Sequence, residues 1–442
     1  MLRFNPPLLA ALLGVFALLH APAAGASAPD KVTWTEISSA VLRENLELRL
    51  ASQQIEASRA DLQRAVLHPN PTVSLADSGW KGSQSPIGRA GDLIARIDQP
   101  IERGEKRLLR ERQGAAALQV AQFDLLHWQR QILTRLAGAL IDLDTTRRRL
   151  AAAQEIAAAL ERADTIARRR LGAGDLSEVG AGRVATDAIR ARNDVSVARG
   201  DIFEALQALR VLLEPRAFEA LQAREIDIDS LPGLAAPVAA AATDGMPDSR
   251  AADALSRSPE LAGARQREEA ARAALALATA QRTRDVTVGV QLERPSYSNV
   301  AVLGVFASFP LHVFNDFSAD IRRASSDLQS ARLETERLTV QLATERSRLA
   351  QAFANARERE ERLRDQALPA AQRNAQTAEY AFQRGAASVL EVLDAQRTLR
   401  GIQIEVLAAR ADRLRAASSV ALIDLAPDRS QPAAAPSPEP KP

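Results

Sequence analysis

The chain has 442 residues, of which 46% are apolar and 25% are charged, while only 4% are aromatic. This composition is typical of long helices, and the length allows several domains. The net charge of +2 is too small to indicate a nucleic-acid partner, because acidic residues nearly balance the arginines. Cysteine is absent, which excludes disulfides, thiol nucleophiles and thiolate metal sites.

The first 26 residues have the pattern of a secretory signal peptide. Arg3 supplies a positive charge, residues 8–19 form a short apolar run, and residues 24–26 are small, as a cleavage site requires. A membrane anchor is the alternative, but the run is short and Pro22 follows it. No other segment approaches the roughly 18 apolar residues that a transmembrane helix needs. We therefore expect an exported mature protein without a helical anchor.

Residues 27–225 form the first of two similar structural repeats. Apolar residues at helical spacing predict a helix over 34–68. Alternating residues then predict a β-hairpin of about 71–101, with strands over 71–78 and 92–101. A continuous helical pattern follows over 105–171, which at 1.5 Å per residue gives a helix of about 100 Å. Another helix, over 175–213, runs back from a turn, so this helix and that of 34–68 can stack end to end beside the long one.

Residues 226–248 interrupt the helical pattern with three prolines and two glycines and are expected to be a linker. The order of elements then recurs over 249–426, so the chain is an internal duplication. The second repeat contains a helix over 249–284, a β-hairpin of about 286–310, a long helix over 317–383 interrupted at Pro369, and a last helix to about 425. The Pro- and Ala-rich tail, 427–442, is expected to be disordered.

Each long helix ends in a short turn, which we call a tip, at about 170–180 and 384–394. Gly385 interrupts the second pattern, and Glu391 and Asp394 then fall on one helix face. Gly172 and Glu178 lie 213 positions earlier, in register with Gly385 and Glu391. An acidic pair on an Arg-rich helix is either a functional pair or a solvated face with salt bridges.

The four predicted strands limit how the protein can meet a membrane. Four strands are too few to close a barrel, and open sheet edges cannot face lipid, because each unpaired N–H or C=O there costs several kcal/mol. If the strands cross a membrane, several chains must therefore pool them. The alternative is a pair of soluble hairpins at the end of a helical stalk, since the pattern of each strand is weak.

The ordered set of elements resembles the outer membrane factor family, the TolC-like channel-tunnels, over almost the whole mature chain. The resemblance is strongest at the tips, RLGAGDLSEV from Arg170 and FQRGAASVLEVLDAQRTL from Phe382. The segment QPIERGEKRLLRERQGAA from Gln99 is similar to members paired with heavy-metal efflux pumps. The resemblance implies a mainly α fold with a membrane β-barrel, in which three protomers each give four strands to a twelve-stranded outer-membrane barrel and their helices to a periplasmic α-barrel. It places the linker and the chain ends in a girdle midway along the tunnel.

The resemblance also implies roles for particular residues. In the family the tips close the tunnel and meet a periplasmic adaptor, which makes Leu171, Gly172, Ala173, Arg384, Gly385 and Ala386 candidates for adaptor contacts. By carry-over, Glu391 and Asp394 face the pore as acidic rings, with Glu178 as a further pore candidate. Carboxylates crowded around a narrow mouth would favour cations. Family members often have a polar residue where Ala387 stands, so the contacts at that position differ here.

The remaining chemistry is sparse. Trp80 and Tyr297, at the loop ends of strands, are either membrane-interface anchors or ordinary loop aromatics. His68 and His312 could approach each other at the ends of strands, but polar surface residues are the commoner case and we expect no metal site. There is no Ser-His-Asp spacing, HExxH or P-loop, so neither an enzyme nor a bound cofactor is indicated.

These observations favour a passive exit duct in the cell outer membrane that extends into the periplasm. Its expected partners are two further copies of the chain, a periplasmic adaptor, an inner-membrane RND-type pump that supplies the energy, and outer-membrane lipid. Metal cations are favoured as cargo on the Gln99 segment alone. The alternatives are a duct for drugs or for type I protein secretion, and a periplasmic coiled-coil adaptor or scaffold.

Overall fold

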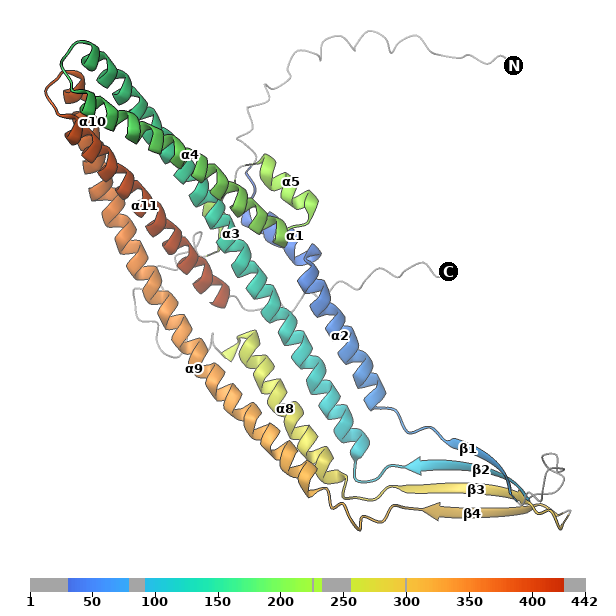
Figure 1. The fold of residues 1–442 in the computed structure, drawn as a ribbon. Helices are drawn as coiled ribbons and strands as arrows, with labels where there is room; N and C mark the ends of the chain where they lie inside the picture. The colour runs from blue at the N-terminus through green and yellow to red at the C-terminus, as the bar shows by residue number, and fades with distance from the viewer. Residues whose placement is uncertain (1–30, 79–91, 225, 233–255, 299, 425–442) are drawn as a thin grey trace, which may run out of the picture.

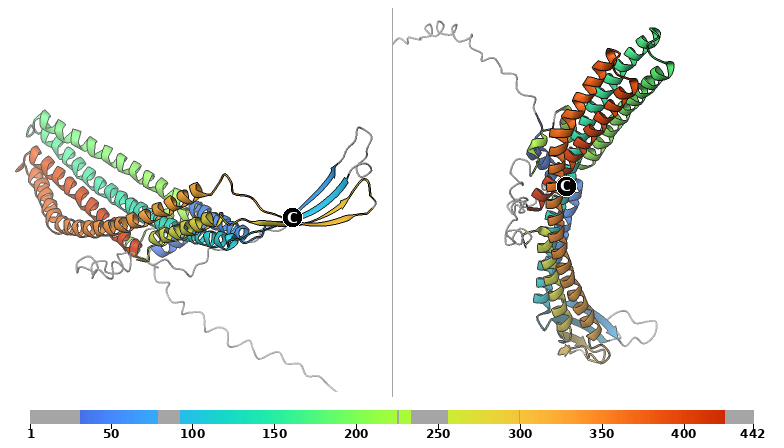
Figure 2. Two further views of the ribbon diagram at one scale, coloured as in Figure 1. Left: turned by 90° about the horizontal axis from the view of Figure 1, so that it is seen from below. Right: turned by 90° about the vertical axis from the view of Figure 1, so that its left-hand side faces the viewer.

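The computed structural model describes residues 31–78, 92–224, 226–232, 256–298 and 300–424. These residues form a long, curved rod with the helical tips at one end and a small sheet at the other (Figures 1 and 2). Among them, none of the helices combines the length and apolarity that crossing a membrane would require. The predicted signal peptide, most of the predicted linker, the tail and Trp80 lie outside the described residues.

Helix α3 (Lys106–Gly172) is the axis of the rod and has 67 residues, as predicted. At its middle, Ile132, Leu136 and Leu140 recur at helical spacing and are at most 1% exposed. Helices α2 (Leu46–Ala65) and α4 (Glu178–Leu212) both pack against α3, one on each half of its length (Figure 1). The predicted end-to-end arrangement of two shorter helices beside the long one is therefore confirmed.

The second repeat is built in the same way around a long helix that is interrupted once. This helix consists of α9 (Ser318–Arg362), a π-helical turn (Leu363–Ala367) and α10 (Leu368–Gln383). Pro369 has no backbone N–H to donate to the preceding turn, which accounts for the widened turn just before it. Helices α8 (Pro259–Ala280) and α11 (Val389–Asp424) pack against α9 and also against α3, so the two repeats lie side by side.

The four strands form one antiparallel sheet in the order β1-β2-β3-β4. The central pair, β2 and β3, joins the two repeats, and β1 and β4 are the edges. The strand bounds are Thr72–Ser78, Asp92–Ile101, Val286–Arg294 and Val302–Ser308. They agree with the predicted hairpins.

The helix predicted over 34–68 is in fact two helices, α1 (Trp34–Glu44) and α2. Asn45 separates them: its backbone is extended, its side-chain oxygen accepts from the N–H groups of Glu47 and Leu48, and its Nδ2 donates to the Leu212 carbonyl. Asparagine at a helix start competes with the continuous helix in this way. The prediction missed this break because the apolar periodicity continues through it.

A short segment after α4 was also missed. Residues Pro215–Ala223 form helix α5, and Ile228–Ser230 form one 3₁₀ turn within the predicted linker. Ile226 forms a parallel bridge with Val32, and the Trp34 N–H donates to Ser230 Oγ at 2.8 Å. The apolar core around the middle of α3 includes side chains from this segment and from α1. The end of the first repeat therefore packs against its N-terminal residues, midway along the rod.

Candidate functional site: the two-faced sheet and the helical tips

The two faces of the sheet differ in chemistry. Paired residues share a face, and successive residues alternate between faces. One face carries exposed apolar side chains from all four strands: Val73, Leu75, Leu93, Ile97, Val288, Val290, Leu292, Leu303 and Val305. The opposite face carries most of the polar ones: Ser74, Asp92, Arg96, Asp98, Thr287, Gln291, Glu293 and Ser308. This division suits lipid on one side and water on the other.

One aromatic side chain lies on the polar face. The Phe306 ring covers Gly289, where an added Cβ would come within 2.1 Å of Phe306 Cζ. The Arg96 guanidinium lies 3.3 Å from the centre of the same ring, and its Nε donates to Asp98 at 2.8 Å. Because residue 289 is glycine, the Phe306 ring of β4 can lie over β3 and contact the Arg96 guanidinium of β2. One ring thus packs across three neighbouring strands.

The tip between α3 and α4 turns at a different glycine from the one predicted. The residue with left-handed backbone is Gly174 (φ 81°), whereas Gly172 is the last residue of α3. The second tip turns at Gly385 (φ 76°), as predicted. Three residues after each turn glycine, Ser177 and Ser388 accept from the N–H groups of Gly180 and Glu391.

The two tips are therefore related by 211 positions, not 213, and Glu178 is not the counterpart of Glu391. The sequence did not show which glycine makes the turn, because RLGAG offers both Gly172 and Gly174 ahead of the helix cap Ser177. Only the backbone conformation distinguishes them.

The acidic candidates differ in their surroundings. Glu391 takes part in a capping box, since its Oε2 accepts from the Ser388 N–H at 2.7 Å while its own N–H donates to Ser388 Oγ at 3.3 Å. Asp394 and Glu178 are exposed, and within the described part of the chain neither has an ion-pair partner. Glu391 thus has a structural role that the sequence analysis did not anticipate, and Asp394 is the more available charge.

The candidates for adaptor contacts are all at the surface. Leu171, an apolar residue, is 38% exposed, and the glycine and alanine that follow it are exposed as well. At the other tip, Arg384, Gly385 and Ala386 are exposed, and the Arg384 guanidinium lies 5.0 Å from the centre of the Tyr380 ring. The proposed interface anchor Tyr297 is 87% exposed in the turn between β3 and β4.

A small core holds the two tips together beneath this surface. Phe382 is 1% exposed and packs with Ala163, Ala167, Val184 and Val392, so that four helices contribute. Arg170 crosses from α3 to α10: its Nη1 donates to the Phe382 carbonyl at 3.3 Å and its guanidinium lies 5.1 Å from the ring centre. This residue was not singled out in the sequence, where it is one of three consecutive arginines.

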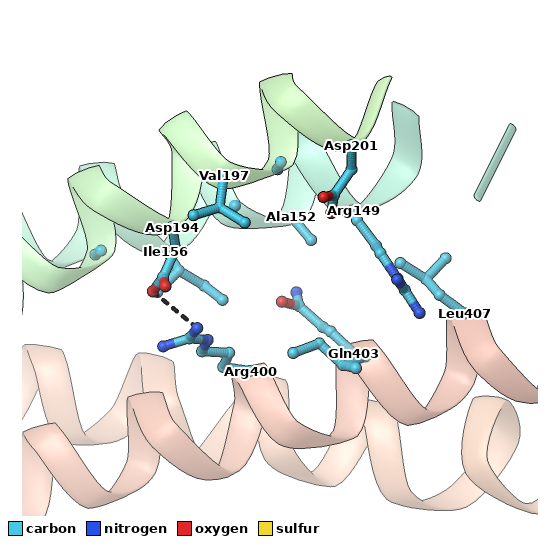
Figure 3. A pocket seen from close by; sticks show the side chains of 13 residues that line it. Arg149, Ala152, Ile156, Asp194, Val197, Asp201, Arg400, Gln403 and Leu407 are labelled. Carbon is cyan, nitrogen blue, oxygen red and sulfur yellow. Dashed lines mark ion pairs between the residues drawn. The ribbon is translucent and has the colours of Figure 1, made fainter. Parts of the chain in front are cut away.

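Farther from the tips, polar contacts join the hairpin of α3 and α4 to the hairpin of α10 and α11. Arg397 pairs with Asp187 at 2.7 Å, and Arg400 pairs with Asp194 at 2.8 Å. Beside the second pair is a cavity of about 240 Å³ between α3, α4 and α11 (Figure 3). Buried Arg149 Nε and Gln403 Oε1 line it without a hydrogen-bond partner in the described part of the chain. The seam between hairpins is thus less densely packed than the core midway along the rod.

Two groups of surface side chains differ from what the sequence suggests. Glu358 pairs with Arg362 four residues later, as on a solvated helix face, but Glu360 is buried and pairs with Arg413 of α11, so this part of α9 is not simply solvated. His68 and His312 flank opposite edges of the sheet, which keeps them apart within one protomer. In the described ranges, no cluster of three potential metal-ligating side chains occurs.

Comparisons with known proteins agree with this architecture. The family model "Outer membrane efflux protein" matches residues 251–424. The cobalt-zinc-cadmium resistance protein CzcC of Cupriavidus metallidurans is 23% identical over 379 residues, which are 85% of this chain and 86% of that protein. The outer-membrane channel OprN is similar in structure (TM-score 0.73, 19% identity, 88% of this chain and 89% of that one).

A crystal structure of CusC is similar to the same degree (TM-score 0.73, 18% identity, 89% of this chain and 92% of that one). At these identities the structural matches establish the fold, and the family model and the CzcC relative add the sequence relationship. The two-faced sheet, the duplicated helical hairpins and these matches together make the chain similar to the outer membrane efflux proteins: the family model covers residues 251–424, and the channel fold extends over most of the chain.

Proposed function

We propose that three copies of this chain form a passive exit duct for metal cations. In this proposal, each copy contributes its four strands to a twelve-stranded barrel in the outer membrane and its helices to a tunnel in the periplasm. An inner-membrane RND-type pump supplies the energy, and a periplasmic adaptor connects the pump to the tips. We expect no catalytic role for the chain, since the family model that it matches is one of efflux proteins.

The observation that carries the proposal is the sheet with one apolar face and two open edges. The apolar face includes Val305 and Leu75, which are 80% and 75% exposed in one protomer. Both are on edge strands, whose outer N–H and C=O groups would be unpaired in lipid. Pairing β4 of one copy with β1 of the next satisfies both edges, and a closed ring of copies leaves none.

A periplasmic scaffold is the weaker alternative. A soluble hairpin pair would need to cover its apolar face with another layer, and in the described residues no helix packs on this sheet. Lipid supplies that cover without further protein.

Metal cations are the proposed cargo because of the sequence relative and the charge at the tips. The relative that spans most of the chain is named for resistance to cobalt, zinc and cadmium. Exposed carboxylates at Asp394, Glu391 and Glu178 would make a tunnel mouth attractive to cations. These carboxylates would attract cations but would not attract neutral drugs or secreted proteins in the same way.

The assembly is tested by separating the inner and outer membranes of cells that express the full chain. We expect the protein in the outer membrane, extracted only by detergent, as a trimer that dissociates when the sample is heated. Recovery of the whole protein from the soluble periplasm would overturn the proposal.

The cargo is tested in cells that lack their own metal-efflux ducts, with this chain expressed beside an adaptor and pump from the same source. We expect less accumulated cobalt, zinc or cadmium than in cells without the chain. Unchanged metal content together with reduced accumulation of a dye or drug would reject the metal assignment and leave the duct intact.

A further inference from the structure

The internal duplication provides a template for the contact between copies. The ends of α2 and α8 are equivalent in detail: the Val66 N–H donates to the carbonyls of Leu62 and Arg64, and the Gln281 N–H donates to those of Leu277 and Thr279. Each residue in the second set is 215 positions after its counterpart in the first. The strands that follow, β1 and β3, can therefore be aligned with the same offset.

The strand pairing carries this alignment to the other two strands. The offset makes Thr72 equivalent to Thr287, and these two residues pair with Asp98 and Ser308. Asp98 in β2 is therefore equivalent to Ser308 in β4, an offset of 210. The same offset relates Pro100 to Pro310, the prolines near the ends of these strands, although the prolines were not used to derive it.

Within one protomer, the two repeats meet where β2 pairs with β3, and there Asp98 faces Gly289. The equivalent of Asp98 is Ser308, and the equivalent of Gly289 is Ser74. We propose that β4 of one copy pairs antiparallel with β1 of the next in the register that sets Ser308 opposite Ser74. This inference rests on the trimer proposed above and specifies the partner surface: a second copy of the chain, joined as the repeats are joined.

The chemistry of the two edges supports this register. It sets Phe306 opposite Ala76, both on the mostly polar face, and Ala307 opposite Leu75, both on the apolar face. A slip of one residue would turn one edge strand's apolar side chains toward water, so the register must preserve this parity. Helix ends and strand pairs alone specify this register, and the faces of the two edge strands match in it without adjustment.

Any slip by an even number of residues preserves the faces, and one such register has structural support of its own. The long helices begin after equivalent left-handed residues, Glu105 (φ 59°) and Phe317 (φ 60°), which are 212 positions apart. Aligning β2 with β4 by that offset makes Ser308 equivalent to Arg96, and the strand pairs then align β1 with β3 by 213. This alignment would set Ser308 opposite Ser78. The offset of 210 instead places the two extra residues in the connection between Pro310 and Phe317, outside the sheet. The helix ends and the prolines agree on the offset of 210, and they therefore favour the register that sets Ser308 opposite Ser74.

The two kinds of seam differ next to the sheet. Within a protomer, Lys106 Nζ donates to Asp285 Oδ1 and to the Thr283 carbonyl, both at 2.8 Å. The equivalents of Lys106 and Asp285 are Ser318 and Asn70, which cannot form an ion pair. The seam between copies therefore depends on the backbone pairing of the edge strands, whereas the seam within a copy also has an ion pair whose lysine is buried.

The absence of cysteine in the chain makes the register directly measurable. The test variant is Ser74→Cys with Ser308→Cys, expressed in the outer membrane and oxidised before electrophoresis without reductant. Opposed residues in antiparallel strands have Cα atoms about 4.5–5.5 Å apart, within the range for a disulfide. We expect covalent dimers and trimers that disappear when reductant is added.

Two matched variants complete the test. Ser78→Cys with Ser308→Cys probes the other register, and we expect few or no covalent oligomers from it. Thr287→Cys with Ser308→Cys joins residues that pair within one protomer and should close without changing the oligomer. The unheated trimer is scored for every variant, which tests the proposed assembly independently of the disulfide.

The outcomes separate the two proposals. Cross-linking by the Ser78 variant in place of the Ser74 variant, or trimers that neither variant cross-links, would overturn the register and leave the trimer standing. Absence of any trimer would overturn the assembly proposed above.

Discussion

The guanidinium of Arg170, at the end of α3, lies 5.1 Å from the centre of the Phe382 ring and donates from Nη1 to the Phe382 carbonyl. It thus joins the tip of the first hairpin to the end of α10 in the second. A cation at a helix C-terminus is also favoured by the helix dipole. One side chain therefore couples the two elements that would have to separate if the tips opened.

We predict that Arg170→Ala loosens the tips. The loss of stacking and of the helix-end contact should cost about 1 kcal/mol, which corresponds to a roughly fivefold shift toward separated tips. Single-channel recordings in planar bilayers should show a higher open probability. Arg169→Ala removes a neighbouring exposed arginine and serves as the control; equal effects from both variants would count against the coupling role of Arg170.

The acidic residues of the second tip should affect ion selectivity unequally. Asp394→Asn removes an exposed charge without disturbing a hydrogen bond in the described structure, so cation selectivity should fall, by about twofold in the permeability ratio, at unchanged stability. Reversal potentials in a salt gradient measure this ratio.

Glu391 requires a different comparison, because it also caps α11. Glu391→Gln keeps an acceptor for the Ser388 N–H and removes the charge, whereas Glu391→Ala removes both. The alanine variant should lose about 1 kcal/mol of stability relative to the glutamine variant. If neither Asp394→Asn nor Glu391→Gln alters selectivity, the carboxylates do not line the conducting path.

Lys106 should be important for the stability of the junction between helices and strands. Its side chain is 4% exposed, while that of Asp285 is 37% exposed, so Lys106→Met removes the charged donor from a partly hydrated carboxylate, which keeps the Arg103 N–H, and from the Thr283 carbonyl. We expect the free energy of unfolding to fall by about 2 kcal/mol, less than for a fully buried pair.

The matched control is Arg107→Met, which removes a positive charge from the next residue at an exposed position. That change should alter stability by no more than about 0.5 kcal/mol. Urea unfolding in detergent, followed by circular dichroism, measures both variants, and similar losses would contradict a specific role for Lys106.

The contact between α3 and α8 should weaken in mild acid. His127 Nδ1 lies 2.6 Å from Glu260 Oε1 and its Nε2 lies 2.8 Å from Gln131 Nε2, an arrangement that fits a neutral ring donating to the carboxylate. Burial, and then the nearby Arg130 guanidinium, lower the pKa of His127 from its usual 6.5. The unfolded chain therefore takes up a proton first as the pH falls below about 6.5, and the folded state loses stability from there downward.

Thermal unfolding at pH 7.5 and 5.5 tests this expectation. The groups that face His127 are Arg130, Asp124, Arg267 and Glu260, so the variant His127→Gln leaves the surrounding charges in place. It should reduce the difference between the two pH values, whereas His68→Gln, at an exposed position, should not. An undiminished difference in His127→Gln would assign the pH dependence to other groups.

The apolar face of the sheet should tolerate charge poorly. Val305→Arg places a guanidinium where lipid is proposed to lie and should cost about 2–4 kcal/mol, the range for midplane positions. Ser308→Arg adds the same charge to the polar face of the same strand and should cost little. The yield of trimer in the outer membrane distinguishes them, and equal yields would argue against lipid contact at Val305.

The sequence by itself determined the succession of helices and strands and their duplication, because these depend on periodicity and on residues that interrupt it. The spacing of Leu136 and Leu140 specifies a buried helical face whatever lies opposite, and Pro369 disrupts its helix locally. The resemblance at the tips likewise came from short contiguous segments. Local rules did not reveal the break at Asn45, whose cap depends partly on the carbonyl of Leu212 in another helix.

The tertiary structure alone decided which side chains meet. Arginines are abundant on every helix, so the sequence could not tell that Glu360 pairs with Arg413 rather than with Arg364, or that Arg170 reaches Phe382. Two glycines in RLGAG were equally suited to a turn until the backbone placed the positive φ at Gly174. Such choices depend on contacts between segments distant in sequence, where burial and geometry select one partner from many chemically equivalent ones.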